Sequence, residues 1–280
     1  MAGNAATAPR PARPAERGAL RRRILSALVL VPVALGAIWA SEASTIILAS
    51  LAGGLMAWEW GKLIGRLDGA AEAVLFVAVG AGSVLVAGFW SVEAGLACAV
   101  LGIAGLTLSG MRRRPGWTAA GLGWILLATI CFVILRADPA VGWKTTLWVL
   151  LVVWAIDTAA YVVGRSVGGP KLAPRISPNK TWSGLFGGMA GAVLVGLVFG
   201  WADGVSAPWW LALVSGGLAV VEQIGDIAES YAKRRFGAKD SGNLIPGHGG
   251  LLDRLDGMLA VVTAVVLLQI VTSERILTWR

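Results

Sequence analysis

The sequence has few charged residues and almost no histidine or cysteine. Only 14% of its 280 residues are charged, whereas a soluble domain carries about 25%. The single histidine, His248, excludes a mechanism that needs a histidine cluster, and a Ser-His-Asp arrangement would depend on this one residue. Cys98 and Cys131 lie inside apolar runs with no metal-ligand spacing, so we expect two small buried side chains and no disulfide framework.

Apolar residues are the most abundant class in the sequence. They make up 56% of the chain, and the mean hydropathy is +0.73. This composition nearly excludes a soluble globular enzyme and a disordered protein. Because a membrane helix needs about 20 mainly apolar residues, we predict an all-α polytopic integral membrane protein with nine transmembrane helices, at 24–40, 44–60, 71–90, 93–109, 119–135, 147–163, 182–201, 209–226 and 257–271.

The positions of lysine and arginine predict the orientation. Of the 24 basic residues, 20 fall in the N-terminal arm or in every second loop after it. By the positive-inside rule, the N-terminus and these loops are cytoplasmic. The positive charge therefore reflects topology and contact with anionic membrane lipids, and we expect no nucleic-acid partner. Tryptophans cluster at the predicted span edges, where we expect them in the headgroup layer: Trp60, Trp90, Trp117, Trp143, Trp182, Trp201 and Trp209.

The polar residues divide the chain into three parts. Residues 1–23 form a basic, flexible cytoplasmic arm, 24–135 are N-terminal membrane helices, and 136–280 form a catalytic region with cytoplasmic loops at 164–181 and 229–256. A charge inside a bilayer costs about 2.5–3.5 kcal/mol, so carboxylates within apolar spans are functional candidates. The sequence has four of them: Glu59, Asp157, Glu222 and Asp226. Glu59 has an alternative interfacial placement beside Lys62.

The first polar region precedes and fills loop 164–181. Asp157, Tyr161 and Arg165 are spaced four apart and form one stripe on a helix, which either binds substrate or only helps helices to pack. The loop is not a P-loop, because it lacks the GxxxxGK[ST] pattern. We expect Ser177 to cap a helix whose first residue is Pro178, with Lys180 in its first turn, which is a weak signal for anion binding.

The second polar region, 222–256, contains more charged residues than the first. Asp226 and Ser230 share a helical face, and Asp253 and Asp256 are three residues apart. Carboxylates without histidine or cysteine suit a hard cation such as Mg²⁺. The neighbouring lysines, arginines and glycines suit a polyphosphate. A solvated loop that only sets topology would explain the basic residues but not the carboxylates.

The segment 230–256 resembles the signature of the phosphatidate cytidylyltransferases (CDP-diacylglycerol synthases). It contains SxxKR, four residues, KD and then PxHGGxxDRxD. Ala232 departs mildly, since the family has a larger apolar residue there. The upstream Asp157, Tyr161 and Arg165 and the run from Ser177 to Trp182 also resemble this family. The resemblance is strong over 145–260, whereas the N-terminal half matches only as hydrophobic helices.

The resemblance implies transfer of the cytidylyl group of CTP to phosphatidic acid, with Mg²⁺ as cofactor, at the cytoplasmic face of the cell inner membrane. It implies metal ligands at Asp226, Asp253 and Asp256, and further catalytic residues at Lys239, Asp240 and Arg254. Expected substrate-binding residues are Asp157, Tyr161, Arg165, Ser177, Asn179, Lys180, Thr181, Ser230, Lys233, Arg234, His248, Gly249 and Gly250. We expect a binding or loop-organising role for His248. A homodimer is compatible with the resemblance.

Two other functions stay open at this point. A transporter would also place carboxylates and glycines in membrane helices, but its path needs polar groups at the midplane and internal symmetry, and no repeat between the halves is evident. A cytidylyltransferase for another polar lipid would share the metal and nucleotide residues and differ in its lipid groove. A CDP-alcohol phosphotransferase is disfavoured because its DG…AR…G…D…D pattern is absent.

Overall fold

Helices make up most of the described part of the chain, as the sequence predicts. The structure is a computed structural model that describes residues 28–109, 114–245, 247 and 249–278. This part of the chain forms a helix at Leu28–Ala40 and eight further helices. These are α2 (Glu42–Leu63), α3 (Ala70–Phe89), α4 (Val92–Ser109), α5 (Pro115–Ala137), α6 (Gly142–Val167), α7 (Trp182–Ala202), α8 (Pro208–Arg235) and α9 (Leu252–Thr272).

Each predicted span coincides with one of these helices, and the all-α membrane class is confirmed. Within the described ranges, α3 to α9 are the 7 helices long and apolar enough to cross a membrane, so the helix at Leu28–Ala40 and α2 do not qualify and the count of nine spans is not confirmed. The helices exceed the predicted spans mainly at the polar ends. α6 continues to Val167, α8 continues to Arg235, and α9 begins at Leu252. The connection between α8 and α9 is therefore 236–251, and Glu229, Ser230, Lys233, Asp253 and Asp256 are helical.

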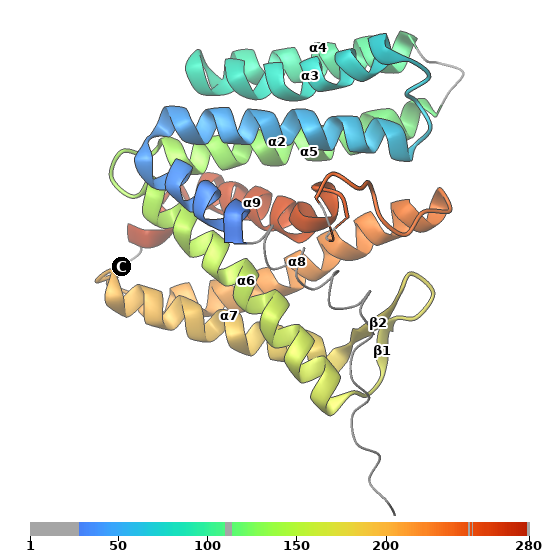
Figure 1. Ribbon diagram of the computed structural model, residues 1–280. Helices are drawn as coiled ribbons and strands as arrows, with labels where there is room; N and C mark the ends of the chain where they lie inside the picture. Colours follow the sequence, from blue (N-terminus) through green and yellow to red (C-terminus); the bar gives the residue numbers. More distant parts are fainter. Residues whose placement is uncertain (1–27, 110–113, 246, 248, 279–280) are drawn as a thin grey trace, which may run out of the picture.

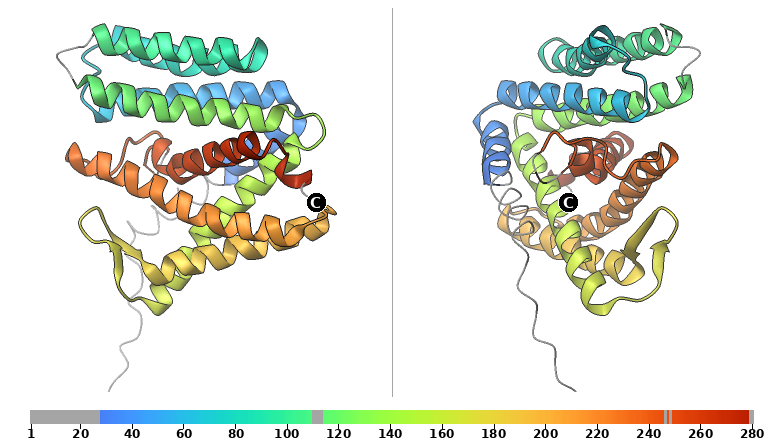
Figure 2. Two further views of the ribbon diagram at one scale, coloured as in Figure 1. Left: turned by 180° about the vertical axis from the view of Figure 1, so that it is seen from behind. Right: turned by 45° about the vertical axis from the view of Figure 1, so that its right-hand side comes forward.

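The helices are arranged in layers across the molecule (Figures 1 and 2). α3 and α4 form one outer side, and α2 and α5 lie next to them. α9 lies between this N-terminal part and the group formed by α6, α7 and α8. The catalytic region predicted from the sequence thus packs against α5 of the N-terminal part, mainly through α9 and α6.

Glycines allow several of these helices to approach closely. Where α2 crosses α3, a Cβ atom on Gly80 would stand 2.7 Å from the Gly53 carbonyl oxygen and 2.8 Å from Ala57 Cβ. Where α7 crosses α6, a Cβ on Gly191 would stand 2.8 Å from Ala159 Cβ. Helices in a bilayer gain little from the hydrophobic effect, so close packing of small residues is a main source of their association.

The other secondary structure of the described residues is a 3-10 turn at Ile276–Thr278 and a short hairpin between α6 and α7. Strand β1 (Lys171–Ala173) pairs antiparallel with β2 (Ser177–Thr181). The expected N-cap at Ser177 is therefore wrong: Ser177 and Pro178 lie in β2, and α7 begins at Trp182 with Thr181 as its N-cap. The Thr181 side chain accepts a 3.1 Å hydrogen bond from Gly184 N. Proline fits this strand because a two-stranded sheet consists of edge strands.

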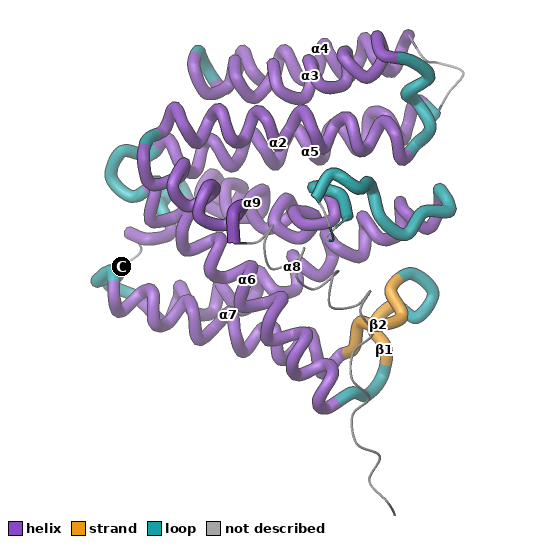
Figure 3. Tube along the Cα trace, viewed as in Figure 1, coloured by secondary structure: helices purple, strands orange, loops and turns teal. Residues whose placement is uncertain are grey.

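The hairpin and connection 236–251 lie at the same end of the helix bundle, on the right of Figures 1 and 3. The turn between α2 and α3 lies there too. The opposite end contains the connections between α3 and α4, α5 and α6, and α7 and α8. The alternation of basic and non-basic loops in the sequence therefore corresponds to the two ends of the bundle.

Of the seven predicted edge tryptophans, five are exposed, Trp117 is partly buried and Trp60 is buried. Trp90, Trp143, Trp182, Trp201 and Trp209 are exposed, as expected for side chains in the headgroup layer. Trp60 is buried instead, and its indole Nε1 donates a 2.9 Å hydrogen bond to the Trp117 carbonyl oxygen. The expectation for Trp60 is wrong because α5 packs over that position, where Gly121 leaves room for the indole ring.

We predict that Gly80→Ala destabilises the protein by about 1–3 kcal/mol, because the new methyl group has to displace α2 backbone. Gly82→Ala on the same helix is the matched control, since a Cβ there meets nothing within 4 Å. Unfolding of both variants in detergent, followed by loss of helical signal, measures the difference. Equal stability of Gly80→Ala and Gly82→Ala would contradict the close crossing.

Candidate functional site

The site is assembled where β2, α8 and α9 meet. Lys180 of β2 forms a 2.5 Å ion pair with Asp226 of α8. The Ser230 hydroxyl, one helical turn further along α8, donates a 3.3 Å hydrogen bond to the same carboxylate. The hairpin is thus connected to α8 through a charge that the sequence places in an apolar span.

A second ion-paired group connects α8 to α9. Lys233 forms ion pairs with Glu229 on its own helix and, at 2.8 Å, with Asp253. Asp253 also accepts hydrogen bonds of 2.8 Å from Gly250 N and 2.9 Å from Ser241 N. Glu229 and Lys233 are both buried. A buried ion pair that is broken by removal of one partner leaves an uncompensated charge, so this group restrains the relative position of the two helices.

Further carboxylates interact with Asp226 of the first ion-paired group. Asp157, Asp226 and Asp256 all interact electrostatically with the buried Glu222. Glycines bring α8 and α9 together here: a Cβ on Gly257 would stand 2.7 Å from Glu222 Cγ. Carboxylates from α6, α8 and α9 therefore share one region, and Lys180 and Arg254 are cations that interact with them.

The chemistry of these side chains fits a divalent cation such as Mg²⁺. All the donors are carboxylate oxygens, which are the ligands that this ion prefers. Within the described residues, no three acidic, histidine or cysteine side chains already form a metal-ligand set. Asp226 faces Lys180, and Asp253 faces Lys233 and two backbone amides. Asp226 and Asp256, which interact electrostatically with each other, are the carboxylates best placed to hold an ion if Lys180 moves aside.

Connection 236–251 closes over this end of the helices. Ile245 and Gly249 exchange two backbone hydrogen bonds, of 2.9 and 3.2 Å, and Gly249 has a φ of 92°, which favours glycine. Arg234 donates from Nε to the Ile176 carbonyl at 3.3 Å and from Nη1 to the Ala238 carbonyl at 3.0 Å, so it links the hairpin to the connection. Lys239 and Asp240 are exposed, and His248 lies outside the described residues.

Other predicted site residues lie at the edge of this group. Tyr161 and Arg165 are exposed on α6, and the Arg165 guanidinium donates a 2.7 Å hydrogen bond to the Tyr161 hydroxyl. Of their predicted stripe, Asp157 is the member with interactions to the α8 carboxylates and Lys180. On β2, Asn179 is exposed, Ser177 is partly buried, and Thr181 caps α7.

Besides Glu222, three residues outside the predicted set also belong to the region. Glu229 is a partner of Lys233, and Ser241 donates its backbone amide to Asp253. Glu59 comes from α2, and its carboxylate accepts hydrogen bonds from Leu251 N and Leu252 N. The signal for Glu59 in the sequence is its negative charge inside an apolar run. Glu59 is fully buried against α9, whereas the Lys62 ammonium lies 5.2 Å from the Trp58 ring centre.

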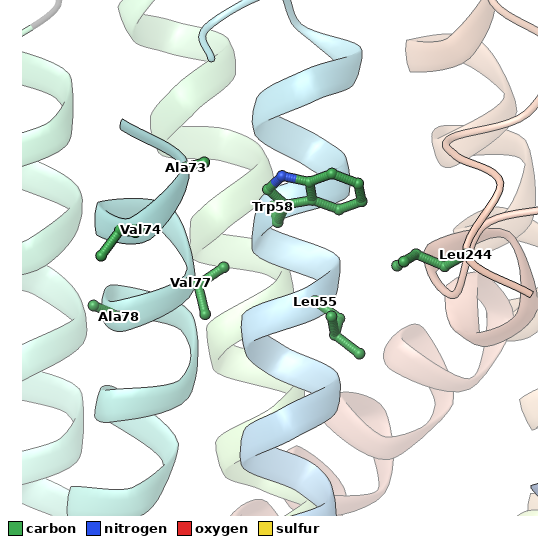
Figure 4. A pocket seen from close by; sticks show the side chains of 7 residues that line it. All are labelled: Leu55, Trp58, Ala73, Val74, Val77, Ala78 and Leu244. Atoms are coloured by element: carbon green, nitrogen blue, oxygen red, sulfur yellow. The ribbon is translucent and has the colours of Figure 1, made fainter. Parts of the chain in front are cut away.

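An apolar hollow lies beside the charged region. Its volume is about 470 Å³, and it opens between α2 and α3 with Leu244 of connection 236–251 on its far side (Figure 4). Its lining residues are Leu55, Trp58, Ala73, Val74, Val77, Ala78 and Leu244. Hydrocarbon fits these walls, whereas a triphosphate does not. The hollow is therefore distinct from the charged region.

We predict that Lys233→Met lowers the free energy of unfolding by about 3–5 kcal/mol, because Glu229 and Asp253 lose their shared cation. The control is Lys144→Met, which removes the partly exposed Lys144–Asp203 pair and should cost about 0–1 kcal/mol. Denaturant unfolding in detergent measures both. A loss for Lys233→Met no larger than that for Lys144→Met would contradict a restraining role of the buried group.

Comparison with known proteins assigns the family. A model of the cytidylyltransferase family matches residues 21–271, so the similarity extends well beyond the C-terminal half in which the signature lies. A phosphatidate cytidylyltransferase of Brucella suis is 39% identical over 267 residues, which cover 91% of this chain and 95% of that protein. One of Pseudomonas aeruginosa is 37% identical, with 87% and 94% covered. The chain belongs to the cytidylyltransferase family.

Proposed function

We propose that the protein transfers the cytidylyl group of CTP to phosphatidic acid and forms CDP-diacylglycerol and pyrophosphate. The observation that carries this proposal is the group of carboxylates and lysines that β2, α8 and α9 assemble at one end of a membrane helix bundle. A reaction between a soluble nucleotide and a membrane lipid needs a polar site at such a boundary. Relatives that match this chain over most of its length are named phosphatidate cytidylyltransferase, which supports the same reaction.

The reaction needs alignment and charge neutralisation more than proton transfer. An oxygen of the lipid phosphate, already ionised, forms a bond to the α-phosphorus of CTP while the bond from this phosphorus to the bridging oxygen of pyrophosphate breaks. Cations that face both reactants lower the repulsion between them. No general base is required, which agrees with a site of carboxylates and basic side chains.

The basic residues divide by position. Lys180 and Arg165 are assigned to the lipid phosphate. Lys180 lies in the hairpin on β2, and Arg165 lies in the last turn of α6, just before the hairpin. The exposed Arg234, Lys239 and Arg254 are assigned to the triphosphate and the leaving pyrophosphate. Lys233 is already held between Glu229 and Asp253, so we assign it the task of holding α8 and α9 in register.

We further propose that Mg²⁺ binds at Asp226 and Asp256, with Asp253 adjacent. When bound, the ion would neutralise charge on the phosphate oxygens of CTP. Lys180, now paired with Asp226 at 2.5 Å, is then available to move toward the lipid phosphate. The carboxylates that cluster around Glu222 support this proposal, since their mutual repulsion favours an added cation.

We expect purified protein in mixed micelles to convert labelled CTP into a labelled lipid only when phosphatidic acid and Mg²⁺ are both present. EDTA should abolish the product. A product with a different polar lipid, and none with phosphatidic acid, would replace the proposed acceptor. No product with any lipid from folded protein would oppose the enzyme and favour the transporter.

The metal assignment predicts that Asp226→Asn lowers turnover by about 100-fold or more, since loss of a residue that only hydrogen-bonds to a metal ligand already costs about 10–100-fold. Asp203→Asn is the control, because Asp203 forms its 2.5 Å ion pair with Lys144 at the opposite end of the bundle. Turnover is measured over a series of Mg²⁺ concentrations. Near-normal turnover of Asp226→Asn at low Mg²⁺ would remove Asp226 from the proposed ligands.

We further propose that this multi-pass protein lies in the inner membrane. Its site then faces the cytoplasm, where CTP and Mg²⁺ are available. The end of the bundle that holds the site also holds the basic connections, which supports this orientation. Sealed inside-out vesicles should convert added CTP without detergent, whereas sealed right-side-out vesicles should not. The reverse result would invert the topology.

A homodimer stays a prediction.

A further inference from the structure

We propose that Glu59, on α2 of the N-terminal half, is a positioning residue for the site, because its carboxylate holds the first turn of α9 and thereby the placement of Asp253 and Asp256. The inference rests on the proposed function in one respect: the consequence for turnover presupposes that these aspartates serve cytidylyl transfer. The anchoring itself is a property of the structure.

The hydrogen bonds of Glu59 converge on one turn of chain. Its Oε1 accepts a 3.0 Å hydrogen bond from Leu251 N, and its Oε2 accepts a 2.8 Å hydrogen bond from Leu252 N. The Ser241 hydroxyl approaches Oε2 at 3.4 Å. Glu59 is fully buried, so these donors replace the water that a carboxylate otherwise requires. Both carboxylate oxygens are used.

The start of α9 depends on such help from outside. The first N–H groups of a helix have no partner within the helix and are commonly capped by the side chain of the N-cap residue. The N-cap of α9 is Leu251, whose apolar side chain forms no capping hydrogen bond. Glu59 takes this task from another helix, while Asp253 accepts from Gly250 N at 2.8 Å and from Ser241 N at 2.9 Å. Two carboxylates therefore bind one tight segment of backbone.

One glycine of connection 236–251 is explained by the same carboxylate. A Cβ on Gly242 would stand 2.5 Å from Glu59 Oε1, and its three nearest atoms all belong to Glu59. Gly242 has no positive φ, so the backbone conformation does not require glycine there. The space that Glu59 occupies does require it. A Cβ on Gly250 would meet the Ser241 hydroxyl oxygen at 2.1 Å before it meets Glu59 Oε1 at 2.7 Å. The N-terminal half thus contributes a specific contact to the site in addition to hydrophobic packing.

The test compares Glu59→Gln with Glu42→Gln, an exposed glutamate in the first turn of the same helix. A glutamine has one acceptor oxygen, and its amide group would face a second N–H donor. We expect Glu59→Gln to lower kcat at saturating CTP and phosphatidic acid by about tenfold or more, the size of a lost hydrogen bond to a charged group. The control should keep wild-type turnover.

A second measurement separates positioning from general stability. Amide hydrogen exchange of peptides covering 241–255 should quicken in Glu59→Gln, while exchange in α3, α6 and α7 stays as in the wild type. Quicker exchange throughout the protein, or reduced kcat with unchanged exchange in 241–255, would overturn a positioning role. Unchanged kcat would overturn it as well.

A second variant, which keeps Glu59, tests the same contact in case Glu59→Gln does not fold. Gly242→Ala places a methyl group against the carboxylate, and we expect the same local increase in exchange and a fall in kcat of about tenfold, in line with a displaced charged hydrogen bond. Normal kcat and normal exchange of Gly242→Ala would contradict the inference. If wild-type protein makes no CDP-diacylglycerol, the proposed function fails, whereas the exchange comparison still decides whether Glu59 anchors α9.

Discussion

The pairing of two lysines with carboxylates of α8 and α9 is the interaction on which the site depends. Lys180 binds Asp226, and Lys233 binds both Glu229 and Asp253. In an apolar bundle these carboxylates have little water to solvate them, so each cation is held where its partners lie. The first pair docks the hairpin on α8, and the second joins α8 to α9. Three separate segments of chain are thereby brought to one place.

Close helix packing makes this pairing geometrically feasible. α8 and α9 approach through Gly225 and Gly257, where a Cβ would stand 2.7 Å from Ala260 Cβ and from Glu222 Cγ, respectively. The acidic side chains next to these glycines then converge between the helices. Small residues in membrane helices promote association in general, and here they also bring like charges together, which creates a region that attracts cations. The close packing of α8 and α9 therefore both joins the two helices and gathers the acidic side chains.

Much of the architecture follows from local sequence. Nine apolar segments become nine helices in the described chain, because a helix satisfies its own backbone hydrogen bonds in hydrocarbon. Local reasoning failed at Ser177 and Pro178, which match a helix start but form a strand, since pairing of β2 with β1 outweighs the capping pattern. It also failed at Trp60, whose place at a span edge does not reveal that α5 covers it.

The sequence by itself determined the helices, the uneven distribution of basic residues and the carboxylates and glycines of the region 222–257, because these depend on composition and spacing along the chain. Only the tertiary structure decided which charges meet. The contact of Glu59 with Leu251 and Leu252 joins residues more than half the chain apart, and the Lys180–Asp226 pair requires a hairpin to fold back over α8. Hydrophobicity sets where each segment lies relative to the membrane, but it does not distinguish among neighbouring helices. The choice of neighbour comes from close packing and from hydrogen bonds and ion pairs, whose energies depend on distances of a few ångströms in the folded protein.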